Sequence, residues 1–366
     1  MSAVRQERLQ RVRDAMASHG VEVLLLSLGA DLPWLTGYTA MPLERLTMLV
    51  LPVDGDATMV VPALEAPRVH EQPGIFSLRP WAETEDPIGI VAGMVGSGRR
   101  VAVSDRTWAT FMLQLQGRLP GASWQAASVV TGPLRAVKDT AEIAALVRAS
   151  AAADRVALEL VHGAIPLIGR TEAEVSADIG RRLVAEGHDQ VNFAIVGSGP
   201  NSASPHHDAG DRVIGPDEAV VCDFGGTMDG YCSDITRTVF TGGPPAEFRD
   251  LYAVLQEAQA AAVAAAVIGT PCQEVDAVAR QIITAAGYGP HFIHRTGHGI
   301  GMAEHEDPYI AGGNDEPLVA GHAFSVEPGI YLAQRFGARI EDIVVAEEAG
   351  PRSLNRVDHA LAVVGA

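Results

Sequence analysis

Short apolar runs alternate with longer segments of mixed polarity along roughly the first third of the chain. Helices are predicted over residues 3–19 and 107–119, and strands over four apolar runs. These runs are VEVLLLSL (21–28), TMLVLPV (47–53), ATMVVPA (57–63) and RVAVSD (100–105). Such alternation favours an α/β domain with a mixed sheet. The segment contains no dense cluster of side chains suited to catalysis.

The pattern breaks near VVTGPLRAVKD (129–139), which predicts a domain boundary. We place the N-terminal α/β domain at residues 1–130 and a second domain at residues 131–366. Asp139, followed three residues later by Glu142, is typical of a helix N-cap. The Ala-rich run that follows, TAEIAALVRASAAADRVALELVHGAI, predicts one long helix.

The second domain contains an internal repeat with an offset of 100 residues. GRTEAEVSADIGRRLVAEG (169–187) aligns without gaps on GTPCQEVDAVARQIITAAG (269–287), with six identities. Each copy predicts a helix that opens after a threonine cap and ends at a glycine. The strands repeat too, because EAVVCDFG (218–225) resembles HAFSVEPG (322–329). Six identities can arise by chance, but the repeated order of elements favours a pseudo-twofold α+β domain with a site between its halves.

The first predicted hairpin, VVCDFGGTMDGYCSDITRT, carries two acids. A two-residue turn at Met228-Asp229 would place Asp223 opposite Asp234, and any loop of this parity keeps both on one face. Charged carboxylates on buried strands are costly unless a partner compensates them.

The second predicted hairpin, SVEPGIYLAQRFGARIEDIV, repeats the arrangement. An odd-length loop centred on Gln334 pairs Glu327 with Glu341 and Gly329 with Arg339. The two hairpins together offer four acids, which repel one another. The sequence therefore predicts bound cations.

One histidine fits this set. His298 lies between Gly297 and Gly299, where missing side chains would let the backbone crowd a ligand. Four carboxylates and an imidazole suit Mn²⁺, Co²⁺, Fe²⁺ or Zn²⁺. Five such ligands can hold two metals about 3.5–4 Å apart, which lower the pKa of a bridging water and polarise a carbonyl. That is hydrolase chemistry.

Composition narrows the function classes. With 366 residues, 47% hydrophobic and 20% charged, the chain is expected to be globular with two domains. A balance of 27 basic to 45 acidic residues argues against nucleic acid or an anionic membrane as a partner. The arginine-rich start is not typical of a signal peptide, and no apolar run reaches the roughly 20 residues of a membrane span. Three cysteines without a CxxC pair favour a reducing compartment, so we expect a cytoplasmic location.

The other motifs in the sequence give little information about function. GSGPNS fits neither GxGxxG nor GxSxG, and EHEDP is not HExxH. Cys222 and Cys232 lie beside the acids, but packing roles are expected for them. Two interpretations of Phe193 stay open: it forms the floor of a proline pocket, or it is a core residue.

Four segments together resemble blocks of the pita-bread metallopeptidases, and within them the Xaa-Pro enzymes, prolidase and aminopeptidase P. They are VCDFGGTMDGYCSDITRT, HRTGHGIGMAEHEDP, SVEPGIY and GARIEDIV, in the family's order. The resemblance spans roughly residues 126–350. The N-terminal domain is a looser match, although its size fits the extra domain of the Xaa-Pro branch, which methionine aminopeptidases usually lack.

The resemblance implies a set of metal ligands. Asp223 would chelate one metal, Asp234 and Glu341 would bridge both, and His298 with Glu327 would complete the second. Glu327 would also shuttle the proton of the attacking water.

Three further residues are implied as catalytic. His206, chosen over His207 because it directly follows the proline of GPNSASPHHD, matches a substrate-binding histidine. His305 matches a histidine that contacts substrate or stabilises the tetrahedral intermediate, and Arg339 matches an arginine beside the last metal ligand.

The resemblance thus implies a dinuclear hydrolase that removes the N-terminal residue from Xaa-Pro dipeptides or peptides through a metal-bridging hydroxide. Manganese is the expected metal, with cobalt, iron or zinc as alternatives, the partner is a small peptide, and a homodimer fits the family. The alternatives are an aminopeptidase of broader specificity, a creatinase-like hydrolase and an inactive pita-bread binding protein. The last two branches lack the metal ligands, and all five are present here.

Overall fold

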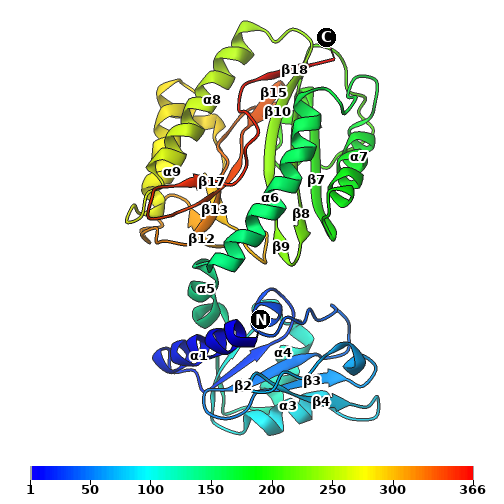
Figure 1. Cartoon of the computed structure of the whole chain (residues 1–366), viewed down its shortest axis with the longest axis vertical. Coiled ribbons are helices and arrows are strands. Elements are labelled where there is room, and N and C mark those ends of the chain that lie inside the picture. Colours follow the sequence, from blue (N-terminus) through cyan, green and yellow to red (C-terminus); the bar gives the residue numbers. More distant parts are fainter. Residues whose placement is uncertain (1, 366) are drawn as a thin grey trace. The chain divides into compact units, whose positions relative to one another are not determined.

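The computed structural model describes residues 2–365, and the chain divides into two compact units, Met1–Arg135 and Ala136–Ala366 (Figure 1). We call them the N-terminal and C-terminal units. The fold class is as predicted, an α/β unit followed by a larger α+β unit.

The N-terminal unit is built on a six-stranded mixed sheet of order β4-β3-β2-β1-β5-β6. β1 pairs antiparallel with β2 and parallel with β5. Its core is formed by apolar side chains from the strands and from helices α3 and α4. The elements are α1 (Ser2–Ser18), β1 (Val23–Leu26), α2 (Asp31–Thr36), β2 (Met48–Pro52), β3 (Thr58–Pro62), η1 (Ala66–Arg68), β4 (Ser77–Trp81), α3 (Pro87–Val95), β5 (Arg100–Val103), α4 (Ala109–Arg118), β6 (Ser123–Ala126) and α5 (Ser128–Ala136).

The strands that the sequence pattern missed, β4 and β6, are the two edges of this sheet. β4 contains Arg79 and Pro80, and none of the four residues of β6 is fully buried. An edge strand need not carry an apolar alternation, because it is less covered by the core. The predicted break at residues 129–139 is in fact occupied largely by α5, which holds Pro133 inside it.

Two sheets form the C-terminal unit, together with a separate two-stranded ribbon. The first sheet has the order β18-β10-β8-β7, with β9 paired to β8, and α6 and α7 pack on it. The second has the order β12-β11-β13-β16-β17, and α8 and α9 pack beside it, while β14 and β15 form the ribbon (Figure 1). Each half has its own apolar core.

The elements of this unit are α6 (Thr140–Val161), α7 (Glu172–Ala185), β7 (Gln190–Ser198), η2 (Gly199–Ala203), β8 (Glu218–Met228), β9 (Tyr231–Cys232), β10 (Ile235–Thr241), α8 (Ala246–Ala265), α9 (Cys272–Ala285), η3 (Gly289–His291), β11 (Gly297–Gly299), β12 (Glu306–Ile310), β13 (Ala323–Val326), β14 (Gly329–Leu332), β15 (Phe336–Arg339), β16 (Asp342–Val345), β17 (Arg352–Ser353) and β18 (Ala362–Val364).

The internal repeat is confirmed at the level of elements. The bounds of α7 and α9 differ by 100 residues at both ends, and each follows a longer helix, α6 or α8. One detail is wrong. Thr171 caps α7 in a capping box with Glu174, but α9 begins after Pro271 with no side-chain cap. The capping box predicted for α6, between Asp139 and Glu142, is present.

The predicted register of the first hairpin is wrong by one residue on each strand. Its turn is Asp229-Gly230, with φ angles of 51° and 81°, and Asp223 pairs with Thr236 instead of Asp234. A tight turn of this kind needs positive φ at both central residues, which Met228 would resist. The parity is unchanged, so Asp223 and Asp234 still share one face.

In the second hairpin, Gly329 pairs with Arg339 across a three-residue loop, as predicted. The direct pairing of Glu327 with Glu341 is not formed. The strands change sheets at this point, and Glu341 instead bridges to Thr236 of β10 in the first half. The second hairpin thus reaches across to the first.

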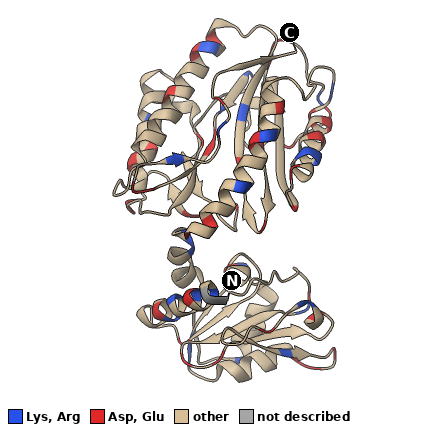
Figure 2. Cartoon of the chain, in the orientation of Figure 1, with Lys and Arg blue, Asp and Glu red and all other residues tan. Residues whose placement is uncertain are grey.

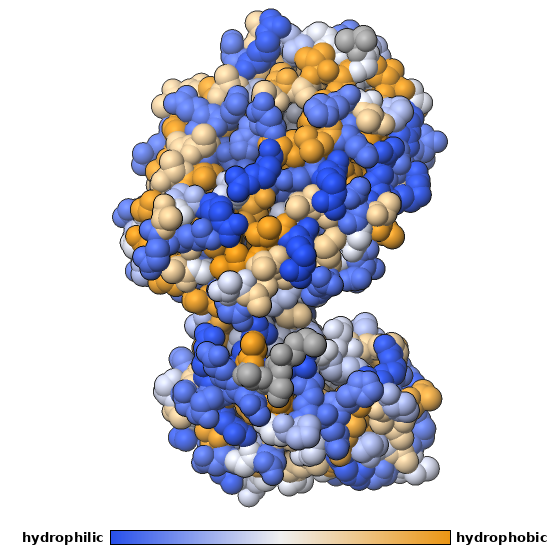
Figure 3. Space-filling view, viewed as in Figure 1, coloured by the Kyte–Doolittle hydropathy of each residue, from blue (hydrophilic) through white to orange (hydrophobic). Residues whose placement is uncertain are grey.

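Charge is distributed unequally between the units (Figure 2). The N-terminal unit has 12 basic and 13 acidic residues, whereas the C-terminal unit has 15 and 32. Apolar residues on the face shown in Figure 3 occur in small groups among hydrophilic ones. Among the helices within residues 2–365, none combines the length and apolar character needed to cross a membrane.

Candidate active site

All eight predicted site residues line one cavity of about 490 Å³ in the C-terminal unit. They are Asp223, Asp234, His298, Glu327, Glu341, His206, His305 and Arg339, and the wall is completed by Phe193, Ile195, Pro205, His294, Arg295 and Glu304. Both halves of the unit contribute, as expected for a site between them.

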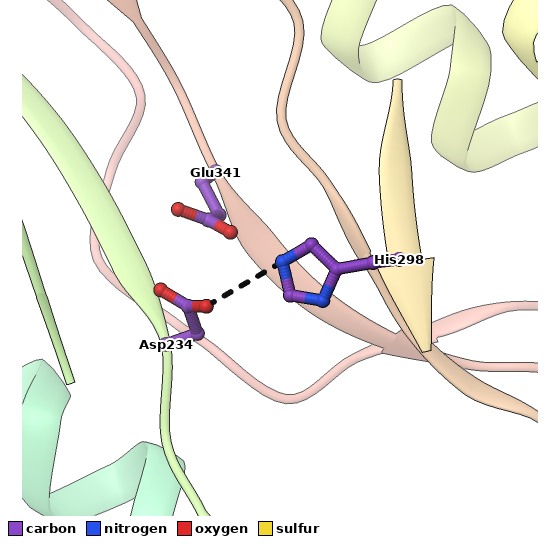
Figure 4. A group of neighbouring side chains, drawn as sticks. All are labelled: Asp234, His298 and Glu341. Atoms are coloured by element: carbon purple, nitrogen blue, oxygen red, sulfur yellow. Dashed lines mark ion pairs between the residues drawn. The ribbon is translucent and has the colours of Figure 1, made fainter. Parts of the chain in front are cut away.

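Three of these side chains form a group that could hold a metal ion (Figure 4). Ligand atoms of Asp234, His298 and Glu341 all lie within 4.8 Å of one another, and all three residues are buried. His298 Nε2 is 3.7 Å from Asp234 Oδ2 and 3.3 Å from Glu327 Oε1. Asp234 comes from the loop between β9 and β10, whereas His298 and Glu341 belong to the second half.

Two oxygens in this cluster have no protein partner. Asp223 Oδ1 and Asp234 Oδ1 are buried without a hydrogen bond from any residue in the described range, 2–365. A buried carboxylate oxygen without a donor costs free energy, which a cation would remove. The donor set therefore fits divalent metal ions.

The imidazole of His298 is oriented for a metal. Its Nδ1 lies 3.2 Å from the carbonyl oxygen of Gly299, which can only accept, so Nδ1 carries the hydrogen. The lone pair of Nε2 then points toward the carboxylates of Asp234 and Glu327. Burial, with the charge of His305, lowers the pKa of His298 to about 3. A neutral ring with this tautomer is the form that binds metals.

Burial and the crowding of the acids raise their pKa values. Burial and then the charges of Glu341 and Asp223 raise the pKa of Asp234 well above its usual range. Burial and the charges of Glu327 and Asp223 do the same to the pKa of Glu341. Burial, with a contribution from Asp223, raises the pKa of Glu327 to about 7. In the absence of a cation, this crowding favours the protonated forms of the three carboxyl groups.

Thr236 joins the two halves at the site. Its hydroxyl donates to Glu341 Oε2 at 2.6 Å, and its carbonyl accepts from the Glu341 amide at 3.2 Å. The same hydroxyl oxygen accepts from Arg339 Nε at 3.1 Å. A residue of β10 thus orients an acid supplied by the other half.

The two adjacent histidines point in different directions. His206 lies on the cavity wall and is exposed, whereas His207 Nε2 is 2.7 Å from Glu172 Oε2 and away from the metal cluster. His305 also lines the cavity, with its ring centroid 4.0 Å from that of His298.

The glycines beside His298 have a packing role that the sequence pattern did not predict. A Cβ at Gly297 would lie 1.8 Å from the carbonyl oxygen of Ser325, and one at Gly299 would lie 2.3 Å from that of Asp307. The missing side chains let neighbouring backbone segments approach β11.

Comparison with protein families identifies the fold. The model for metallopeptidase family M24 matches residues 141–348, and the model for the creatinase/prolidase N-terminal domain matches residues 8–137. This chain belongs to metallopeptidase family M24. It is therefore a metallopeptidase with the pita-bread fold predicted for its C-terminal unit, a family property that implies divalent metal ions and a peptide substrate.

Relatives of the M24 chain include several named dipeptidases. The crystal structure of dipeptidase PepE from Mycobacterium ulcerans is 45% identical, with a TM-score of 0.93, and the match covers 99% of this chain and 98% of that one. Recombinant prolidase from Thermococcus sibiricus is 36% identical, with a TM-score of 0.92 and 98% of both chains covered. The Xaa-Pro dipeptidase of Lactobacillus helveticus is 35% identical over 97% of this chain and 98% of its own length.

Sequence reasoning missed several residues of the M24 site, among them His294, Arg295 and Tyr331. The Tyr331 hydroxyl accepts from Arg339 Nη1 at 2.8 Å and lies 2.9 Å from His294 Nε2, to which it can donate. Register could have found Tyr331, because it lies two residues beyond Gly329 on the face of Arg339. A Cβ at Gly329 would lie 2.2 Å from the Tyr331 hydroxyl, so this glycine makes room for it.

Proposed function

We propose that this M24 chain is a dinuclear Xaa-Pro dipeptidase. Asp223, Asp234, His298, Glu327 and Glu341 would hold the two metals. The observation that carries the proposal is the buried cluster of carboxylates in which Asp223 Oδ1 and Asp234 Oδ1 find no partner within residues 2–365. When bound, the metals would supply a hydroxide that bridges them and would polarise the scissile carbonyl.

Glu327 is the proposed proton carrier. A carboxylate beside the metals can accept and return the proton of the attacking water, and in the metal-free protein burial raises the pKa of Glu327 to about 7. The Ser325 hydroxyl donates to Glu327 Oε1 at 3.1 Å and fixes that oxygen near His298. His206 and His305 are the proposed contacts for the carbonyl oxygens around the scissile bond, because both line the cavity.

The cavity also suits a proline ring. Phe193 and Ile195 alternate along β7 and pair with Gly225 and Asp223, which places their side chains on the metal face of the sheet. They give that wall an apolar surface, and a proline nitrogen needs no acceptor because it carries no hydrogen. The names of the relatives from Lactobacillus and Thermococcus support the same choice of substrate.

Arg295 is the proposed receptor of the free carboxylate of a dipeptide. It lines the cavity, its guanidinium stacks 4.4 Å over the Tyr309 ring, and none of the described residues forms a hydrogen bond or ion pair with that guanidinium. Arg339 is unsuited to this task because its donors already reach Asp223, Tyr331, Thr236 and the Pro205 carbonyl. A dipeptidase needs such a charge, whereas an enzyme for longer peptides must leave that end open.

Four further features are proposed: manganese as the metal and a homodimer, from the family resemblance, a cytoplasmic location, from the cysteine content, and domain limits at residues 130 and 131, from the break in the sequence pattern. Aminopeptidase activity on longer peptides is the competing function.

One assay separates the functions. The purified chain, stripped of metal and reloaded with Mn²⁺, Co²⁺ or Zn²⁺, is offered Xaa-Pro, Xaa-Pro-Ala and Xaa-Ala with the same N-terminal residue. We expect turnover of Xaa-Pro that depends on metal. A preference for the tripeptide would indicate an aminopeptidase, equal turnover of Xaa-Ala would remove the proline specificity, and full activity after exhaustive chelation would exclude the metal mechanism.

A further inference from the structure

Lys138 is the only lysine in the sequence, and it is buried. Its side chain is 1% exposed, and Nζ lies 2.8 Å from Oε1 of Glu306, whose side chain is 9% exposed. Lysine is among the residues least often buried in this way unless it has a charged partner. Because both side chains are buried, surface solvation does not explain this ion pair.

The pair connects the start of the C-terminal unit to the histidine-bearing strands. The backbone of Lys138 is fixed separately, because its amide donates to the Gly321 carbonyl at 2.9 Å. Glu306 directly follows His305 and pairs with Gly299, the neighbour of His298. The ion pair thus holds the residue that follows His305, and that residue pairs in turn with the neighbour of His298.

Room for this pair is made by a glycine. A Cβ at Gly301 would lie 2.4 Å from Glu306 Oε1 and 3.1 Å from Lys138 Cε. Any larger residue would have to displace one of the two charged groups. The absence of a side chain at Gly301 thus leaves space for the ion pair.

The strands themselves are weakly defined. β11 has three residues, and its register with β12 shifts between Gly297 and Gly299. The six residues between β11 and β12, which include His305, form no helix or strand. The ladder pairings of β11 and β12 do not include His305, whose ring centroid lies 4.0 Å from that of His298.

We infer that Lys138 and Glu306 form a positioning ion pair that sets where His305 stands relative to His298. The inference rests on the proposed function only in giving His305 a substrate contact. A buried ion pair contributes little net stability, because desolvation of the two charges offsets their attraction. It does fix one geometry, and displacement of a catalytic group by about 1 Å can cost about 10²-fold in rate.

The decisive variant removes both charges at nearly constant volume, Lys138→Met together with Glu306→Gln. Because the pair is roughly neutral for stability, we expect the thermal midpoint to stay within about 4 °C of wild type, equivalent to roughly 1 kcal/mol. Metal content should also be retained. We expect kcat for Xaa-Pro to fall about 10- to 100-fold. The matched control neutralises an exposed pair of the same unit, Arg335→Met with Glu247→Gln, and should leave kcat unchanged.

A second readout does not depend on turnover. The His305 ring lies at 62° to the His298 ring, so ring currents report their separation. In the metal-free protein, the imidazole resonances of His305 should shift in the double variant and not in the control. If wild type fails to cleave Xaa-Pro, the proposed function fails, and this measurement still tests the positioning.

Unchanged imidazole resonances in the double variant would overturn the inference, and so would wild-type kcat with wild-type metal content. A loss of kcat that only follows a loss of metal or of folded protein would overturn it too. If the double variant does not fold, Glu306→Asp is measured instead. Aspartate keeps the negative charge, but its side chain is shorter by one methylene. It should then shift the same resonances and lower kcat.

Discussion

Arg339 Nη2 donates to Asp223 Oδ2 at 2.6 Å, and both side chains are buried in the site. One oxygen of Asp223 is therefore taken by the protein, while Oδ1 is without a partner among residues 2–365. The resemblance implies that Arg339 is catalytic, and in this geometry its donors are engaged by Asp223, Tyr331 and Thr236. We propose that it orients an acid of the metal cluster.

Replacing Arg339 by Met should thus act through Asp223. Removing one partner of a buried pair costs about 3–5 kcal/mol, because the other charge stays buried. We expect the metal-free variant to unfold at lower denaturant concentration, and added metal to restore part of the loss. The measurement is a chemical denaturation curve with and without Mn²⁺. Exposed Arg335→Met is the control, and equal curves for both variants would contradict this role.

Metal affinity should rise with pH. Glu327 has its pKa raised from 4.5 to about 7, and the pKa values of Asp234 and Glu341 are raised too. Below pH 7 a metal must displace these protons, so affinity should increase about tenfold per pH unit for each proton released. Calorimetric titration of the chelated protein in buffers of different ionisation enthalpy measures that release. Binding without proton release between pH 6 and 7 would refute it.

The same pKa values affect folding of the metal-free chain. An acid whose pKa is raised by folding adds stability below its unfolded pKa of 4.5, which is lost as pH rises through about 7. Histidines with lowered pKa values, such as His298 and His294, act in the opposite direction. The difference between wild type and Glu327→Gln isolates the acid. The variant should therefore gain stability relative to wild type from pH 5 to pH 8, and a constant difference would contradict the raised pKa.

Glu327→Gln also tests catalysis. The amide keeps the shape and a ligating oxygen but cannot accept a proton, so kcat should fall by about 10²–10⁴. Metal content is measured on the same sample. A variant that binds metal fully and turns over near the wild-type rate would show that the proton carrier is another group.

Much of the site followed from periodicity. Parity alone placed Asp223 with Asp234 on one face and Gly329 opposite Arg339, because side chains alternate strictly along a strand. Because the turn lies at Asp229-Gly230, the register of the first hairpin differs from the predicted one by one residue on each strand. Both registers nevertheless place the two acids on the same face. The repeat predicted α7 and α9, since each helix has a regular apolar face and a glycine end.

Other features depend on contacts that no local pattern contains. The bridge from Thr236 to Glu341 joins strands 105 residues apart and gives the second hairpin its place. Likewise, the engagement of Arg339 by Asp223 and Tyr331 appears only once both halves are assembled. The edge strands β4 and β6 were missed because their sequences lack an apolar alternation.

The two neighbouring histidines should have separable roles. His206 is exposed on the cavity wall, so His206→Ala should lower kcat/KM by about 10²-fold without changing the thermal midpoint. His207 holds the buried carboxylate of Glu172, which also accepts from Ser198 and Asn201. His207→Ala should instead cost about 1–3 kcal/mol of stability. Steady-state kinetics and thermal denaturation of both variants measure this, and an exchange of the two effects would reverse the assignment.

Arg295 should decide between dipeptides and longer substrates. Its guanidinium is stacked on Tyr309 and faces the cavity, where a free C-terminal carboxylate could take its donors. A hydrogen bond to a charged group is worth about 1.5–3 kcal/mol, so Arg295→Met should lower kcat/KM for Xaa-Pro about 10- to 150-fold. Xaa-Pro amide, which lacks the carboxylate, is the matched control. Wild type should prefer the acid to the amide, and the variant should lose that preference while hydrolysing the amide as wild type does. If the variant loses activity equally on both substrates, Arg295 supports the site in another way and the carboxylate is bound elsewhere.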